Sequence, residues 1–247
     1  MNINLISCLF VLDSKRNENI RKNDIKKIKL LVTKENILPK ISFNSNGIKG
    51  EIRKNIKSII GTNIFHLEQA FTMDYDNNID IIYLGATNIE NVKKLDNNYK
   101  LIEFEVINND TIIFDNSIYK YKTKEKIKNN NIEYFHKINC KDEDVNRNLL
   151  ETLICYKKIR SNIDNTDILF KFMASTFTLE DVRILYELIK NTTVDKSNFR
   201  KKIIKYCEKT DTKDNKKIGY RPSQNYKFKP LKGDMWLWYL HQIMKEN

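Results

Sequence analysis

Cysteine, histidine, glycine and proline are all scarce in this chain. Its 247 residues include four cysteines, three histidines, six glycines and three prolines. The cysteines are widely spaced, form no Cys-x-x-Cys pair and make no zinc-binding pattern with the histidines, so we expect reduced thiols in a cytoplasmic protein. The low glycine and proline contents argue against a disordered or fibrous chain.

Long apolar runs are also missing. The first apolar stretch is short, lacks a cationic start and ends at Asp13, which argues against a signal peptide. No segment approaches the ~20 apolar residues of a membrane-spanning helix, so we expect no membrane partner. The 40% of hydrophobic residues is enough for a core, and the length allows one large or two modest domains.

Positive charge is concentrated near the C-terminus. Residues 190–232 contain fourteen Lys and Arg against four acids, a local net charge of +10, while the whole chain carries +12. The rest of the protein is therefore close to neutral, and the positive field belongs to one module. This clustering, rather than the total charge, points to a polyanionic partner.

Two helices and a hairpin are predicted in this basic region. Thr178 is an N-cap candidate with Asp181 at the third position, and Asn191 can end the first helix. A second helix is predicted over Asp195–Tyr206, with Phe199 at the start of its apolar face. A polar turn follows, then residues 219–228, where aromatic residues alternate with lysines as in a strand. Helix, turn, helix and hairpin in this order are typical of a winged helix.

The opposite face of the second helix carries polar and cationic side chains. A helix in the major groove needs short polar groups for base edges and cations for phosphates. We predict base contacts from Ser197, Asn198 and Lys201. We predict phosphate contacts from Arg200, Lys205, Lys216, Lys217 and Arg221. The competing interpretation is a solvated helix face, which is the commonest meaning of such residues; the charge cluster and the hairpin favour DNA.

The upstream sequence predicts a larger α/β domain. Strands are expected at 3–12, 26–33, 64–73 and 79–86 and within 99–122, and helices at 51–60 and 142–161. Residues 122–131 are predicted to form a charged surface loop or a short helix. We divide the chain into a domain at 1–140, a bridging helix at 141–165, a winged helix at 166–232 and a helical tail at 233–247. The tail, which holds both tryptophans, packs on its own domain or forms a dimer contact.

The basic module resembles the C-terminal winged helix of the Nudix-related transcriptional regulators. The matching elements are Phe177-Thr178-Leu179, Tyr186-Glu187, Asp195-Lys196-Ser197-Asn198-Phe199-Arg200-Lys201-Lys202, Gly219-Tyr220-Arg221-Pro222 and Tyr226. The resemblance extends more weakly upstream, where the order of strands and helices is that of a Nudix domain. It implies an α/β Nudix-like sandwich domain followed by an α+β winged-helix DNA-binding domain.

The acids of a Nudix active site are absent from the matching segment. Leu38-Pro39-Lys40 corresponds to the opening of the Nudix box and Gly61 to its closing glycine. The Arg-Glu pair and the two glutamates of the box are replaced by Lys54, Asn55, Ser58 and Ile59. Glu51 is the only acid between Pro39 and Gly61, and one carboxylate cannot hold the metal that this hydrolysis needs. We therefore expect no hydrolase activity, no metal and no cofactor.

The resemblance further implies a repressor that binds a palindromic site on double-stranded DNA as a homodimer. Non-catalytic members of the family sense ADP-ribose or a related nucleotide, which loosens their binding to DNA. Two alternatives stay open: a divergent Nudix hydrolase of nucleoside diphosphate derivatives, and a protein-interaction scaffold without DNA. The operator, the regulated genes, the effector and the sign of regulation cannot be deduced from the sequence.

Overall fold

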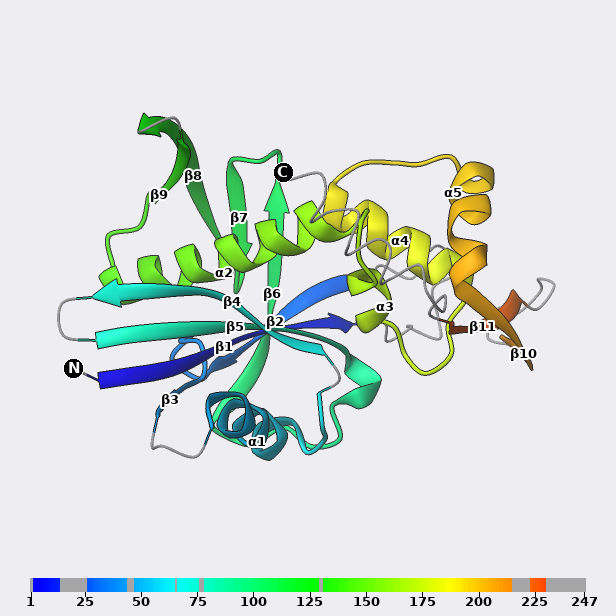
Figure 1. The fold of residues 1–247 in the computed structure, drawn as a ribbon, viewed down its shortest axis with the longest axis horizontal. Helices are drawn as coiled ribbons and strands as arrows, with labels where there is room; N and C mark the ends of the chain where they lie inside the picture. The colour runs from blue at the N-terminus through cyan, green and yellow to red at the C-terminus, as the bar shows by residue number, and fades with distance from the viewer. Residues whose placement is uncertain are drawn as a thin grey trace.

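The computed structural model describes residues 2–13, 26–43, 47–64, 66–75, 78–128, 131–214 and 223–229. Nine strands form one strongly curled sheet in these residues (Figure 1). Their order across the sheet is β4 (His66–Tyr75), β5 (Asn78–Asn88), β1 (Asn2–Asp13), β2 (Lys27–Thr33), β6 (Tyr99–Ile107), β7 (Thr111–Phe114), β8 (Ser117–Lys128) and β9 (Asn131–Ile138), with β3 (Lys40–Ser42) also paired to β1. Strands β1 and β5 are parallel, whereas the other pairs of this sheet are antiparallel.

Strand β1 is buried on both faces, as its nearly continuous apolar sequence predicts. Successive side chains of a strand point to opposite faces. On one face, Phe10 and every second residue beside it in β1 join the larger apolar cluster. This cluster also contains residues of helix α2 (Glu143–Asn162). On the other face, Leu9 and its alternate neighbours join a smaller cluster with helix α1 (Ile48–Ile60). The two helices therefore cover opposite faces of the sheet (Figure 1).

The start of α2 and the end of α1 follow the sequence prediction, whereas α1 begins at Ile48, three residues before the predicted start. The Asp142 side chain accepts a hydrogen bond from the Val145 amide at 3.0 Å and so caps α2. Gly61 ends α1 with φ of 72°, a left-handed conformation, and its amide donates to the Lys57 carbonyl at 2.9 Å. Glycine adopts this conformation without the penalty that a Cβ atom brings.

The C-terminal region contains the predicted winged-helix elements. They are α3 (Ile168–Lys171), α4 (Leu179–Lys190), α5 (Lys196–Ile203), the 3₁₀ turn η2 (Ile204–Tyr206) and the strands β10 (Cys207–Asp214) and β11 (Ser223–Phe228). A further 3₁₀ turn, η1 (Ile89–Asn91), follows β5. The predicted tail at 233–247 lies outside the described residues.

Three local predictions were wrong. Residues 122–131, predicted as a loop or short helix, are largely the paired strands β8 and β9, because their lysines alternate with other residues at the period of a strand. The polar turn predicted after the second helix is mostly strand β10, whose backbone pairs with β11. The helix predicted to reach Tyr206 ends at Ile203 and tightens into η2.

One apolar core connects the sheet to the winged helix. The larger cluster continues from Phe10 of β1 through α2 and α3 to Phe199 of α5 and Tyr226 of β11. The ring centroids of Tyr156 on α2 and Phe10 on β1 are 6.2 Å apart. The Tyr156 hydroxyl donates a hydrogen bond to the Ile189 carbonyl of α4 at 3.2 Å. The two modules are thus packed against each other.

Two further observations concern the compositional predictions. All four cysteines are free thiols, with Cys8 and Cys155 buried and Cys140 and Cys207 half-buried. None of the helices in the described part of the chain combines the length and the apolar character that crossing a membrane requires.

Candidate nucleic-acid interface

Helix α4 begins with a reciprocal cap. The Asp181 amide donates to the Thr178 hydroxyl at 3.2 Å, and the Thr178 amide donates to the Asp181 carboxylate at 2.8 Å. These two bonds satisfy amides that have no partner within the helix. The helix ends at Asn191, which has a φ of 53° and so adopts the left-handed conformation predicted from the sequence.

A cluster of charged side chains on α4 positions the turn that leads to α5. Arg183 forms ion pairs with both Glu180 and Glu187, and these carboxylates hold the pKa of the guanidinium well above its usual value. The other oxygen of Glu187 accepts a hydrogen bond from the Val194 amide at 2.9 Å. The chain is therefore fixed immediately before Asp195, where α5 is capped.

Helix α5 is anchored by two buried side chains. The Asp195 carboxylate accepts a hydrogen bond from the Asn198 amide at 2.8 Å and so caps the helix, which begins where the sequence predicts. Phe199 and Ile203 are buried, and the Phe199 ring lies 5.2 Å from the ring of Tyr186 on α4. Their spacing of four residues directs both side chains to one face of the helix, so the opposite face is turned to solvent.

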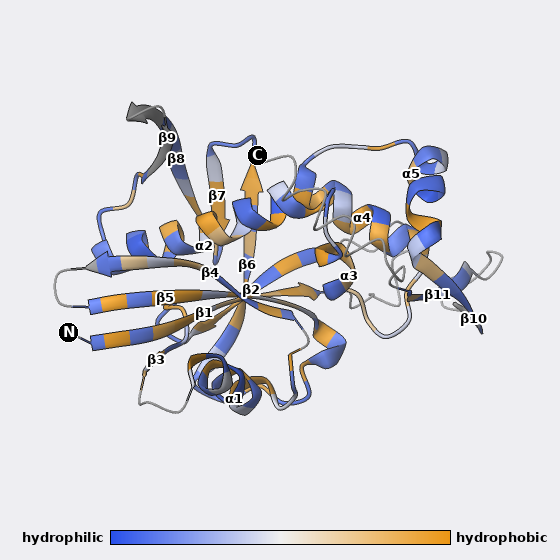
Figure 2. Ribbon diagram, in the orientation of Figure 1, coloured by the Kyte–Doolittle hydropathy of each residue, from blue (hydrophilic) through white to orange (hydrophobic). Residues whose placement is uncertain are grey.

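All of the predicted DNA-contacting residues that the structure describes are exposed. They are Ser197, Asn198, Arg200, Lys201 and Lys205. The first four lie on α5, while Lys205 lies in η2 with its ammonium 4.8 Å from the ring of Tyr206. Figure 2 shows α5 as mainly hydrophilic at its outer turns. Lys216, Lys217 and Arg221, the predicted phosphate contacts of the wing, lie outside the described residues.

The wing, which is the hairpin of β10 and β11, packs on the rest of its module through aromatic residues. Phe177 and Tyr226 exchange backbone hydrogen bonds of 3.0 and 2.8 Å, and Phe170 stacks on Phe228 with ring centroids 4.4 Å apart. Tyr226 is buried while Lys227 is exposed, which confirms the predicted alternation. Strand β11 thus has one face on the core and one cationic face in solvent.

Contacts between distant residues hold the module on the sheet domain. Lys26, which immediately precedes β2, forms a buried ion pair with Asp181 of the α4 cap. The Asn88 side chain at the end of β5 donates to the Phe172 carbonyl at 3.1 Å. Arg160 of α2 donates to the Lys190 carbonyl at 2.8 Å. The sequence did not reveal these links because their partners are separated by 30 to 155 residues.

The ion pair with Lys26 helps to lower the pKa of the capping residue Asp181. Burial by itself disfavours the charged form of Asp181. The ammonium of Lys26 and the hydrogen bonds from Thr178 outweigh that effect and hold the pKa of Asp181 below its usual value. The charged carboxylate is therefore the form that the folded structure stabilises.

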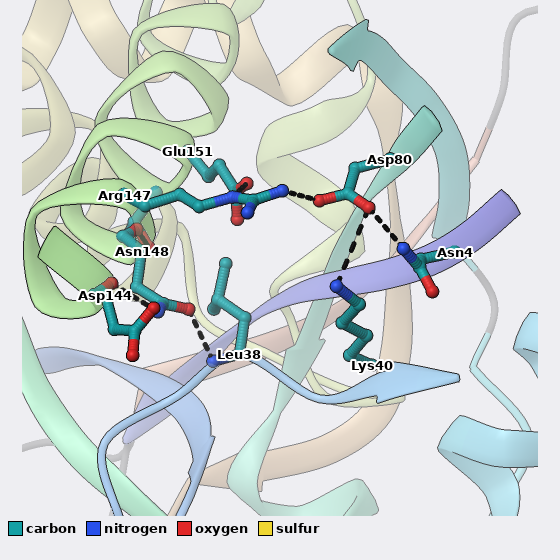
Figure 3. Close-up of polar contacts among 9 residues, drawn as sticks. Asn4, Leu38, Lys40, Asp80, Asp144, Arg147, Asn148 and Glu151 are labelled. Carbon is teal, nitrogen blue, oxygen red and sulfur yellow. Dashed lines mark hydrogen bonds and ion pairs between the residues drawn. The ribbon is translucent and has the colours of Figure 1, made fainter. Parts of the chain in front are cut away.

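A second polar cluster lies between α2 and the sheet (Figure 3). Asp80 of β5 is fully buried; it accepts a hydrogen bond from Asn4 at 2.7 Å and forms ion pairs with Arg147 and, at 3.7 Å, with Lys40. Arg147 also pairs with Glu151 at 3.3 Å. Burial raises the pKa of Glu151, and the charges of Arg147 and Lys40 partly offset this shift.

This cluster ties the segment that matches the opening of the Nudix box to helix α2. The Leu38 amide donates to the Asn148 side chain at 2.8 Å, and Asn148 is itself held by the Asp144 carbonyl at 2.7 Å. One sequence signal could have located the cluster: Asp80 is the only charge in an apolar strand, and a buried carboxylate needs a partner.

The helix that carries the metal ligands in Nudix hydrolases does not fit a divalent cation here. At the four positions where the box requires its Arg-Glu pair and two glutamates, α1 has no acid. Ile59 is buried, and the Ser58 hydroxyl donates to the Asn55 carbonyl at 2.7 Å. Within the described ranges, no three His, Cys, Asp or Glu side chains are grouped closely enough to hold a metal. Magnesium prefers several oxygen ligands, which this helix does not offer.

The edge strand β4 carries the polar residues His66, Glu68 and Gln69. Glu68 forms an ion pair with Lys158 of α2 at 3.4 Å, and Gln69 donates to Thr72 at 3.2 Å. Burial lowers the pKa of His66. The carboxylates of Glu68 and Asp167 raise this pKa, and the ammonium groups of Lys171 and Lys158 lower it.

Comparisons with known proteins agree with this architecture. Residues 169–228 match the family model of the NrtR DNA-binding winged helix domain. A search of curated proteins found no match. Shewanella oneidensis NrtR complexed with a 27mer DNA is similar, with a TM-score of 0.65 and 11% identity over 92% of this chain and 94% of that chain.

Two further solved structures cover almost the whole chain. A second structure of Shewanella oneidensis NrtR has a TM-score of 0.63 and 10% identity over 93% of this chain and 95% of that chain. A MutT/nudix family protein from Enterococcus faecalis has a TM-score of 0.65 and 14% identity over 93% and 88%. The chain therefore combines a Nudix-like sheet domain with a winged-helix domain of the NrtR DNA-binding type, the architecture of the Nudix-related regulators.

Proposed function

We propose that the protein is a transcriptional regulator that binds double-stranded DNA through α5. The supporting observation is the exposed face of this helix, which combines short polar groups near the N-terminus with cations further along. In the major groove, Ser197, Asn198 and Lys201 contact base edges. Arg200 and Lys205, together with the wing residues Lys216, Lys217 and Arg221, contact phosphates.

The sheet domain is proposed to be catalytically inactive. Helix α1 retains Glu51 as its single acid, and a metal-dependent pyrophosphatase needs several carboxylates around its cation. The protein consequently acts without a metal or other cofactor. The Nudix-like domain then serves to sense a ligand instead of cleaving one.

The proposed ligand is ADP-ribose or a related nucleotide, which weakens DNA binding. Three described contacts support a mechanical connection between the two modules. The box-opening segment is bonded to Asn148 of α2, Tyr156 of α2 is bonded to α4, and Lys26 is paired with the α4 cap. A ligand that displaces α2 relative to the sheet therefore moves the helix that supports α5. The protein acts as a homodimeric repressor on a palindromic operator.

A gel-shift assay on the DNA upstream of the protein's own gene tests this function. The wild-type protein should retard the duplex, and Lys201→Glu combined with Arg221→Glu should abolish the shift. Binding that survives the double reversal contradicts the assigned face. A wild-type protein that binds no duplex favours the alternative of a protein-interaction scaffold.

The inactivity of the sheet domain has a separate test. Incubation with ADP-ribose and Mg²⁺ or Mn²⁺, followed by chromatography, should yield no product. Turnover that EDTA abolishes would establish a divergent hydrolase instead. Addition of ADP-ribose to the protein–DNA complex should release the duplex if the nucleotide is the effector.

A further inference from the structure

The turn between α2 and α3 places one carboxylate against two helices of the winged-helix module. Asp164 follows the end of α2, and its side chain is 33% exposed. It accepts a hydrogen bond from the Tyr186 hydroxyl of α4 at 2.8 Å and forms an ion pair with Lys190, the last residue of α4, at 2.6 Å. The same carboxylate lies 3.7 Å from the ammonium of Lys202 on α5. Asp164 therefore joins the segment after α2 to both α4 and α5.

The surroundings of Asp164 favour its charged form. Burial by itself raises the pKa of this carboxyl group. The hydrogen bonds from Lys190 and Tyr186 and the charges of Lys190 and Lys202 outweigh burial, so the pKa of Asp164 lies below its usual value. Burial raises the pKa of Tyr186 to about 12, and its hydrogen bond to Asp164 contributes to that shift. At neutral pH, a carboxylate therefore faces a neutral phenol and two ammonium groups.

Lys202 lies on the flank of α5, between its buried face and the face assigned to DNA. Successive residues of an α-helix are ~100° apart around its axis, so Lys202 is ~100° from the buried Ile203 and ~60° from the buried Phe199. Two anchors one turn apart on the same face hold the helix on α4, but they resist its rotation about its own axis only weakly. An ion pair on the flank limits this rotation.

Rotation of α5 affects base contacts more than phosphate contacts. A helix with its side chains has a radius of ~5–6 Å, so a rotation of ~20° moves the tips of the outer side chains by ~2 Å. Hydrogen-bond lengths vary over only ~0.5 Å, and the short side chains of Ser197 and Asn198 have little reach with which to compensate. Lysine side chains have flexible four-carbon stems that can follow a phosphate over this distance.

We propose that Asp164 is a positioning residue for sequence-specific DNA binding, which sets the rotation of α5 through Lys202 without touching DNA itself. This inference rests on the proposed function, because it requires that α5 reads base edges. Tyr186 and Lys190 hold the carboxylate in place, and Lys202 connects it to α5. Because Asp164 directly follows α2, a displacement of α2 moves this contact and changes how α5 meets the bases.

The ratio of affinities for two duplexes tests the proposal. One duplex is the DNA upstream of the protein's own gene, and the other has the same length and base composition in scrambled order. Fluorescence anisotropy with the full chain measures both affinities at one salt concentration. Asp164→Asn should lower the ratio about tenfold, the effect of losing about one base contact. Asp115→Asn is the matched control, because Asp115 is 32% exposed and pairs with Lys100 in the sheet domain at 3.1 Å; its ratio should equal that of the wild type.

Three further variants show whether the contact with α5 carries the effect. Lys202→Gln should also lower the ratio, and adding it to Asp164→Asn should lower the ratio no further, since both substitutions break one contact. Asp164→Glu keeps the carboxylate and should keep most of the ratio. The melting temperature of Lys202→Gln should match that of the wild type, because its side chain is 58% exposed and exposed ion pairs add little stability.

The outcomes separate this proposal from the proposed function. If Asp164→Asn strengthens binding to both duplexes equally, the carboxylate only neutralises nearby lysines; the positioning role is then wrong while the role of α5 stands. An unchanged ratio in Lys202→Gln also overturns the proposal, because the effect then does not reach α5 through this contact. If the wild type binds neither duplex, or binds both equally, the proposed function and the positioning role fail together.

Discussion

Helices α1 and α5 are both short and amphipathic, and both expose several lysines, yet their settings differ. Helix α1 lies with Ile52 and Ile56 on the sheet, and its lysines Lys49, Lys54 and Lys57 are exposed. Helix α5 lies at the far end of the molecule, with its buried face on α4 and a strand pair beside it (Figure 1). Exposed lysines alone therefore do not mark an interface; projection from the body and a polar N-terminus distinguish α5.

The largest expected effect comes from removing the buried anchor of each helix. Ile56→Ala and Phe199→Ala should each lower the free energy of unfolding by about 3 kcal/mol, because each leaves a cavity in a core. Urea denaturation measures this loss. Under conditions where both variants stay folded, only Phe199→Ala should lose DNA affinity. Equal DNA affinities of the two variants would remove the distinction between the helices.

Breaking the ion pair between Lys26 and Asp181, which attaches α4 to the sheet domain, should give the second largest loss of stability. Lys26→Met leaves the carboxylate of Asp181 without its buried counter-ion, and we expect a loss of about 2 kcal/mol in the free energy of unfolding. Replacing Asp181 by Asn in the same chain should recover part of that loss. Strict additivity of the two single substitutions would show that the pair is not coupled.

Charge reversal on the two solvent faces compares them directly. Lys201→Glu should weaken duplex binding about tenfold, since a contact inside the groove is lost and a repulsive charge is added. Lys54→Glu on α1 makes the same change in net charge and should leave affinity within about twofold. Titration of a labelled duplex at moderate salt measures both. Equal losses would mean that only the overall charge matters.

The stability that the charged Asp181 carboxylate contributes should disappear at acid pH. The folded structure depresses the pKa of Asp181, so the charged form adds stability above the ordinary Asp pKa of about 3.9, and this contribution disappears as the pH falls through the lower folded value. The wild type should be more stable than Asp181→Asn at neutral pH, with the difference shrinking below about pH 4. Chemical denaturation across this range measures it; a constant difference argues against the shift.

The smallest expected effect is that of a divalent metal on the melting temperature, because α1 lacks the acids of the box. Millimolar Mg²⁺ should not change the melting temperature, because a cation that does not bind the folded state cannot stabilise it. Differential scanning fluorimetry with and without EDTA measures this. A concentration-dependent rise that Ile56→Ala leaves intact would point to a metal site elsewhere in the chain.

Local signals predicted much of the fold correctly. Thr178 with Asp181, Asp195 and Gly61 predicted where helices begin or end, because capping depends on residues that are neighbours in the chain. The apolar face that begins at Phe199 predicted the buried side of α5. The lysine-rich strands were missed because charge suggested a loop there, although the alternation itself had the period of a strand.

What the sequence determined by itself was the helix–turn–helix order of the basic module, the basic face of α5 and the absence of acids at the four box positions of α1, since each depends on residues close together in the chain. Only the tertiary structure placed Lys26 on Asp181 and Arg147 on Asp80. Such contacts join residues that are far apart in sequence, and their register is decided by how the sheet and the helices pack. Composition and periodicity carry no record of that packing.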